Sequence, residues 1–185
     1  MKKVFWGFFF VYLNFNLTLN GHALNLLPDF VGYILLFQAA GALAGESGRF
    51  RTLRPFAAGM AVYTGILWVG DLLAVTGGSG WLDGLLSLAA AAVSLFISWS
   101  VVQAVLEIER ARGADLNGQS LRTSWFILLA AQIAGYAAGL LISGALALAA
   151  GLAALAGLIW FLVALWKCAG RYELLPPRDP GPELL

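Results

Sequence analysis

The sequence contains very few side chains that could build an enzyme site. Only 11% of its 185 residues are charged, and it has one cysteine and one histidine. A single cysteine excludes an internal disulfide, and one histidine with one cysteine excludes a metal cage of imidazole and thiolate ligands within a protomer. No HExxH motif, phosphate-binding glycine loop or dinucleotide-binding motif is present. We therefore expect no catalytic activity, no cofactor, no bound metal and no nucleic-acid partner.

Hydrophobic side chains, in contrast, make up 61% of the sequence. Soluble domains average about 45–50% apolar and roughly 25% charged residues, so this excess predicts long helices in a bilayer. The apolar stretches indicate spans at about 4–19, 30–45, 56–76, 81–105, 125–143 and 148–166. We predict an all-α fold, a polytopic membrane bundle of six transmembrane helices over residues 1–172. The Pro-rich segment 173–185 is expected to be a mobile cytoplasmic tail.

The basic residues predict the orientation of these spans. With the N-terminus inside, all 11 lysines and arginines fall on the cytoplasmic side, as the positive-inside rule requires. Both chain ends are then cytoplasmic, and Cys168 lies at the inner boundary of the last span. The sequence therefore predicts a multi-pass protein of the bacterial cytoplasmic membrane, with Trp81, Trp125 and Trp166 at span ends, where interfacial tryptophans are common.

The first span has an alternative interpretation. Lys2 and Lys3, the apolar run that follows and the small residues around His22 also fit a cleaved signal peptide. Asn14 and Asn16 interrupt the end of the run, and its many aromatic residues favour a packed helix, so we expect a retained span.

Small residues recur at four-residue spacing on several spans, which permits close helix packing in lipid. The stripes are Gly41 and Gly45; Ala90, Ser94 and Ser98; Ala131, Gly135, Gly139 and Ser143; and Ala149, Ala153 and Gly157. We expect packing within one chain, the last two stripes facing each other. A homodimer face, or a face for another membrane protein, is the alternative.

Polar residues gather at the predicted outer end. Asp71 lies near the end of the third span, where a carboxylate at membrane depth needs water or a partner. Asn16 and Asn20 are four residues apart and are expected on one helix face, while His22 and Asp29 follow on the same side. We predict that these five residues form a substrate-binding pocket. Because no basic residue lies there, it favours a cation. The alternative is a well-capped loop with Asp71 at the interface.

One short motif suggests an enzyme. Gly77-Gly78-Ser79-Gly80 matches the GxSG pattern around the nucleophile of rhomboid-type intramembrane proteases. The match covers four residues, and His22 precedes the serine, whereas the histidine of that family lies on a later helix. A flexible glycine turn is the favoured interpretation.

The segment Leu26-Leu27-Pro28-Asp29-Phe30-Val31-Gly32-Tyr33 resembles a stretch of small, uncharacterised multi-pass membrane proteins of Gram-positive bacteria. That resemblance implies a membrane location and no particular activity. From the polar residues we expect a protein that binds or transports a small solute or cation through a pocket open to the outer face. The alternative is a non-transporting subunit or regulator that docks a larger complex through its small-residue helix faces.

Overall fold

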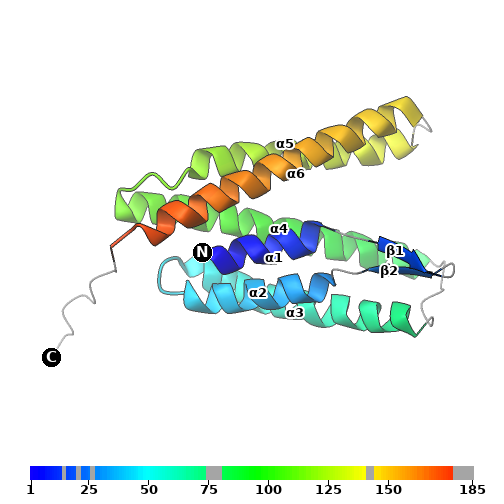
Figure 1. Ribbon diagram of the computed structural model, residues 1–185, viewed down its shortest axis with the longest axis horizontal. Coiled ribbons are helices and arrows are strands. Elements are labelled where there is room, and N and C mark those ends of the chain that lie inside the picture. Colours follow the sequence, from blue (N-terminus) through cyan, green and yellow to red (C-terminus); the bar gives the residue numbers. More distant parts are fainter. Residues whose placement is uncertain (14–15, 20–21, 26–27, 74–80, 141–143, 177–185) are drawn as a thin grey trace.

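The computed structural model describes residues 1–13, 16–19, 22–25, 28–73, 81–140 and 144–176. The backbone alone is described at 16–19, 22–25, 71, 82–83, 135–136, 138–140 and 144–147. The described residues form six helices and one short hairpin (Figure 1). In chain order they are α1 (Lys2–Tyr12), β1 (Asn16–Leu19), β2 (His22–Asn25), α2 (Asp29–Ala42), α3 (Gly48–Leu72), α4 (Trp81–Arg112), α5 (Gly118–Leu140) and α6 (Gly144–Glu173).

The first predicted span differs most from the structure. The helix expected at 4–19 ends at Tyr12, and residues 16–25 contain an antiparallel hairpin in which Asn16 pairs with Asn25 and Leu19 with His22. The prediction that Asn16 and Asn20 share a helix face is therefore wrong, since Asn16 lies in a strand. Asparagine side chains compete for backbone hydrogen bonds and favour turns over helix interiors. The alternation of polar and apolar residues in Asn16–Leu19 also has the period of a strand.

α3 and α5 begin earlier than expected. α3 starts at Gly48, so the arginine-rich segment that we expected to be a connector is helical. The hydroxyl of Ser47 accepts a hydrogen bond from the backbone N–H of Arg49 at 3.2 Å and so caps this helix. α5 starts at Gly118, where the Glu109 carboxylate accepts the backbone N–H of Leu116 and of Gly118, both at 2.7 Å.

The position of Gly118 depends on this contact. A Cβ atom there would lie 2.6 Å from Oε2 of Glu109, so a side chain would displace the carboxylate that caps α5. After α4, the chain turns through Gly113 with φ +60°, a left-handed conformation that glycine adopts without steric cost. α4 therefore continues past the predicted span of 81–105 and ends at Arg112.

α1 and α2 pack closely through two glycines that the small-residue stripes did not include. A Cβ on Gly32 would lie 2.6 Å from the carbonyl oxygen of Gly7 and 2.7 Å from Val11. A Cβ on Gly7 would lie 2.6 Å from the side chain of Leu36. By contrast, a Cβ on Gly45 would meet nothing within 4 Å. The close helix crossing in this region is thus at Gly7 and Gly32, and not along Gly41 and Gly45.

α5 and α6 form an antiparallel pair beside the first four helices (Figure 1). A Cβ on Gly157 would lie 3.4 Å from backbone atoms of Leu128, which is the close approach expected for the sixth span. The environments of Gly135 and Gly139 lie outside the described side chains. Toward the hairpin the α5–α6 pair diverges from α1 and α4, as Figure 1 shows.

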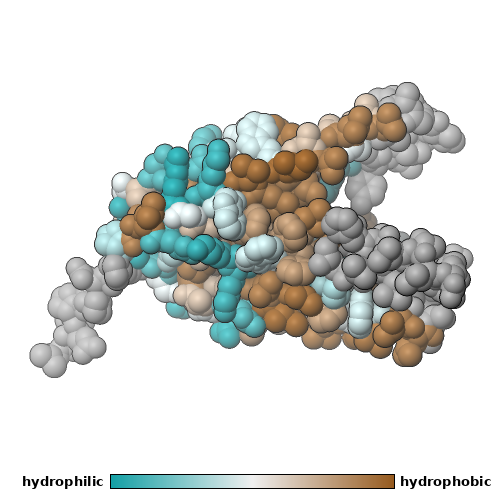
Figure 2. Space-filling view, viewed as in Figure 1, coloured by the Kyte–Doolittle hydropathy of each residue, from teal (hydrophilic) through white to brown (hydrophobic). Residues whose placement is uncertain are grey.

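The two ends of the molecule have different surfaces. Lysine, arginine and glutamate side chains gather at the end that holds the N-terminus and the last turn of α6, which we call the ion-paired end; it contains Lys2, Glu46, Arg49, Glu107, Arg112, Asp115, Arg171 and Glu173 (Figure 2). We call the opposite end, which carries β1 and β2, the hairpin end. Between the two, large apolar side chains face outward, and Val62, Ile66, Leu88, Leu148 and Leu152 are each more than 60% exposed.

The buried core lies mainly in the half of the bundle next to the ion-paired end. Phe50, Ile97, Val101, Ile108 and Phe161 are each at most 1% exposed. Trp125 belongs to this core and is 8% exposed, so it is not the interfacial residue that the sequence predicted. Its indole N–H donates to the hydroxyl of Ser98 at 2.9 Å, which holds α5 against α4.

Candidate binding pocket

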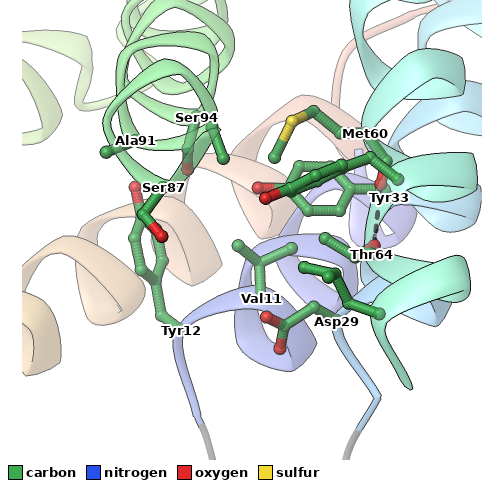
Figure 3. Close-up of a pocket in the computed structure, with 12 residues that line it drawn as sticks. Val11, Tyr12, Asp29, Tyr33, Met60, Thr64, Ser87, Ala91 and Ser94 are labelled. Atoms are coloured by element: carbon green, nitrogen blue, oxygen red, sulfur yellow. Dashed lines mark hydrogen bonds between the residues drawn. The ribbon is translucent and has the colours of Figure 1, made fainter. Parts of the chain in front are cut away.

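A cavity with a largely apolar lining, one carboxyl group and several hydroxyl groups lies between the first four helices, in the half of the bundle next to the hairpin. It has a volume of about 320 Å³, at the lower end of the roughly 300–1,000 Å³ of typical ligand pockets. α1 contributes its last residues, α2 its first, α3 its second half and α4 its first half (Figure 3). The residues that line it are Val11, Tyr12, Asp29, Tyr33, Met60, Tyr63, Thr64, Leu67, Ser87, Ala90, Ala91 and Ser94.

Asp29 is the charged residue of the cavity. It is the first residue of α2, and Pro28 occupies the N-cap position with an extended backbone, which is compatible with the fixed φ of proline. Oδ1 of Asp29 is buried and has no hydrogen-bond partner among the described residues. A buried carboxylate oxygen without a partner is costly, so the site favours a proton, a cation or a hydrogen-bond donor at this atom.

Hydroxyl groups make up the other polar surface of the cavity. Ser87 and Ser94 of α4 face Asp29 across the space in Figure 3. The Thr64 hydroxyl donates to the carbonyl oxygen of Met60 at 2.7 Å, so its free lone pair can accept a hydrogen bond. Tyr12 and Tyr33 both interact with the Ser94 side chain, which joins three of the four helices around the cavity.

The cavity lies where the helical backbone stops. α1 has 11 residues and rises about 16 Å, while the 14 residues of α2 rise about 21 Å at 1.5 Å per residue. Both are shorter than a hydrocarbon core of about 30 Å. In a bilayer, non-helical backbone at such depth is stable only where protein buries it or where it lines a wet cavity. Interrupted helices that meet at mid-membrane are also where transporters bind their substrates.

Of the five predicted site residues, the structure places one in the cavity. Asp29 lines it directly. Asn16 and His22 lie in the two strands and Asp71 in the last turn of α3, but their side chains are outside the described part of the chain. Asn20 lies entirely outside the described residues, as does the glycine turn at 77–80. Whether these polar residues join the pocket therefore stays a prediction.

Most of the polar lining residues could not be identified from the sequence. Tyr12, Tyr33 and Tyr63 are aromatic residues among many in apolar helices, and Ser87 carries no special spacing. Ser94 was noted only as a small residue for helix packing. Their common signal is a hydroxyl group on an otherwise apolar helix, which needs a partner in lipid. That signal does not say which hydroxyls converge.

The ion-paired end contrasts with the cavity, because its carboxylates have partners. Glu46 pairs with Arg112 at 2.6 Å, and both side chains are less than one-fifth exposed. Glu107 pairs with Arg49 and accepts the Ser47 hydroxyl at 2.6 Å. The backbone N–H of Asn117 and the guanidinium of Arg171 hold the pKa of Asp115 below its usual range. These contacts tie the turns between helices together.

The charge distribution favours a cation in the cavity. Every lysine and arginine in the described chain lies near the ion-paired end, in the first two turns of α1, α3 and α5 or the last two turns of α4 and α6. In the topology predicted from the sequence, the acidic residues of the outer half are Asp29, Asp71 and Asp83. The described residues contain no cluster of three metal-ligating side chains.

No protein-family model, curated protein or solved structure shows a significant match to this chain. The chemistry of the cavity is therefore argued from its own residues.

Proposed function

We propose that this chain is a six-span membrane protein with both ends in the cytoplasm, and that it binds a small solute or cation in the cavity between α1, α2, α3 and α4. The cavity opens toward the outer face, at the hairpin end. The observation that carries the proposal is the buried Oδ1 of Asp29, which has no hydrogen-bond partner among the described residues and lies in a space where several side chains carry hydroxyl groups. Burial of a polar atom without a partner lowers the stability of a folded protein, so the presence of such an atom favours a functional role.

The surface of the molecule supports a membrane location. Two helical segments, Gly84–Arg112 with 29 residues and Leu148–Glu173 with 26, are long and apolar enough to cross a bilayer. Exposed apolar side chains on α3, α4, α5 and α6 surround the middle of the molecule, and a contiguous apolar surface of this kind suits lipid contact. The basic residues gather at one end, as expected for a cytoplasmic face.

The binding proposal is tested by thermal unfolding of the purified protein in detergent. A panel of small organic cations, alkali cations and neutral polar solutes is added to the parent chain, to Asp29→Asn and to Asp115→Asn. Asp115 is the matched control, because it is a carboxylate that is 80% exposed at the ion-paired end. We expect at least one compound to raise the melting temperature of the parent and of Asp115→Asn, but not of Asp29→Asn. A panel without effect, or with equal effects on Asp29→Asn, contradicts the proposal.

The orientation is tested with introduced cysteines and a membrane-impermeant thiol reagent on intact cells. The natural Cys168 is fully buried, so it stays unlabelled in either orientation and does not need to be removed. A cysteine in place of Leu174, which is 85% exposed just after α6, should label only in broken cells. A cysteine at position 21, between the two strands, should label in intact cells, and the reverse pattern contradicts the topology.

A second candidate function is that of a docking subunit, favoured by the divergence of the α5–α6 pair from α1 and α4. Leu152 and Leu155 of α6 are 62% and 53% exposed. If the α5–α6 pair binds a partner protein, native gels of mild membrane extracts should show a larger complex. Polar substitutions at Leu152 and Leu155 should dissociate it. Asp29→Asn should leave that complex intact. If the chain instead binds a solute, Asp29→Asn should abolish ligand binding and Leu152→Gln should leave it unchanged.

A further inference from the structure

We infer that the ligand of this cavity is a small organic ammonium ion, with its charge at Asp29 and its apolar body against the tyrosine side chains. The inference deepens the proposed function and rests on it, since it names the class of solute that the same cavity takes.

The sign of the charge follows from the residues around the cavity. Among the described lining residues Asp29 is ionisable as an acid near neutral pH, and none is basic. Val11 and Tyr12 come from the last turn of α1, where backbone carbonyls without helical partners give the helix end a negative partial charge. The first turn of α2, which holds Asp29, contributes a partial charge of the opposite sign. The sign is therefore decided by the full charge of the Asp29 carboxylate, which repels an anion and attracts a cation.

The size and ligand set disfavour a bare metal ion. A volume of about 320 Å³ is many times the roughly 30 Å³ that one water molecule occupies in the liquid. Calcium takes six to eight oxygen ligands, usually including several carboxylates, and the described residues hold no group of three acidic, histidine or cysteine side chains. An ion with an organic body fills this space, while a monatomic ion leaves most of it to water.

The walls suit the organic part of such an ion. Tyr12, Tyr33 and Tyr63 come from three different helices and line the same space. Aromatic rings attract ammonium groups through their negatively charged faces. Hydroxyl lone pairs of Ser87 and Ser94 can accept N–H or O–H donors of the ligand, and Met60 and Leu67 cover apolar carbons. Carboxylate, rings and hydroxyls together are the chemistry that recognises an amine with a short carbon chain.

Binding of matched charged and neutral probes tests this directly. Calorimetric titrations of the purified, detergent-solubilised full chain use choline and n-butylammonium. The neutral counterparts are the choline isostere with a tert-butyl group in place of trimethylammonium, and n-butanol. Sodium chloride is titrated separately. We expect one or both ammonium probes to bind, and the neutral counterpart to bind at least roughly tenfold more weakly, because it lacks the charge-assisted contact with Asp29.

Variants separate the charge from the aromatic contribution. Asp29→Asn should weaken binding of the ammonium probe by roughly ten- to a hundredfold. Tyr63 is half-buried on α3, so Tyr63→Leu removes a ring with little loss of core; it should weaken binding about five- to thirtyfold. Tyr63→Phe keeps the ring and should bind nearly as well as the parent, which distinguishes ring contact from a phenol hydrogen bond.

The remaining outcomes all contradict the inference, but they have different consequences for the proposed function. If the neutral counterparts bind as tightly as the ammonium probes, or if sodium alone binds in an Asp29-dependent way, the ligand class is wrong and the solute pocket stands. If neither ammonium probe binds while another solute of the wider panel does so through Asp29, the result is the same. If nothing binds through Asp29, both the inference and the proposed function are wrong.

Discussion

Carboxylates occur at both ends of this bundle, and their surroundings differ. At the ion-paired end Glu46, Glu107 and Asp115 each meet an arginine, and Glu109 caps a helix. At the hairpin end Asp29 has a buried oxygen with no partner among the described residues. The first group holds helix ends together, whereas Asp29 costs stability in the unliganded chain. The comparison indicates that the carboxylates of the ion-paired end maintain the fold, and it supports the proposal that the cavity with Asp29 binds a ligand.

The largest effect on stability is expected where α1 and α2 cross at two glycines, which have no side chains. In Gly32→Ala the new Cβ meets the carbonyl oxygen of Gly7 at 2.6 Å, and this backbone atom cannot rotate away. α1 and α2 must separate, which we expect to cost about 1–3 kcal/mol of unfolding free energy, or more. Thermal unfolding in detergent with circular dichroism measures it.

Gly59→Ala is the matched control for this substitution. Gly59 lies within α3, and a Cβ there meets nothing within 4 Å. The higher helix propensity of alanine should leave the stability unchanged or raise it by up to about 1 kcal/mol. Equal losses in Gly32→Ala and Gly59→Ala would show that α1 and α2 do not cross at this site.

The next effect concerns the polar contact inside the packed half of the bundle. Ser98→Ala leaves the buried indole N–H of Trp125 without its acceptor, which should cost about 1–3 kcal/mol. In the double variant with Trp125→Phe no donor remains, and part of the loss should be recovered. A double variant less stable by the sum of both single losses would mean that the two residues do not interact.

Smaller effects are expected from the ion pairs, and they should depend on burial. Glu46→Gln breaks a pair whose side chains are 16% and 17% exposed, and the melting temperature should fall measurably. Glu173→Gln breaks the Lys2 pair, whose side chains are 43% and 56% exposed, and should change the melting temperature little, since solvent screens such pairs. A larger effect at Glu173 would reverse this ranking.

The smallest effect on stability is expected at Asp29, and it tests the comparison most directly. Asp29→Asn is the same carboxylate-to-amide change as at Glu46, but it removes a buried charge that has no partner. The melting temperature of the ligand-free protein should be unchanged or higher. A clear loss of stability would show that Asp29 has a structural partner, and the two ends would then be alike.

The long helices could be predicted from the sequence, because apolar runs and glycine turns are local signals. α4 contains the whole of the predicted span 81–105, and the end of α5 at Leu140 and the start of α6 at Gly144 lie close to the predicted break between spans 125–143 and 148–166. The hairpin could not be predicted from hydropathy, since Leu17, Leu19 and Leu24 prolong the apolar run while the asparagines stop the helix. The crossing of Gly7 and Gly32 uses one glycine from each helix, so no spacing within a helix reveals it.

The candidate site was predicted in part for the same reason. Asp29 stands out as a charge beside an apolar span, and the structure places it in the cavity. Tyr12, Ser87 and Ser94 come together only because the end of α1 packs beside the first half of α4. Their convergence depends on how four helices pack, and the sequence of each helix alone does not contain it.

The shortness of α1 has a consequence for the order in which the protein assembles. Its 11 residues are synthesised before the other helices of this bundle, yet they cannot cross a bilayer of about 30 Å alone. The backbone that follows needs protein around it, and α3 and α4, which supply the facing walls, are synthesised later. The N-terminal segment should therefore enter the membrane early and reach its final conformation late, after the fourth helix has arrived. In chains stopped at increasing lengths, we expect protease protection of the hairpin to appear only once α4 has emerged.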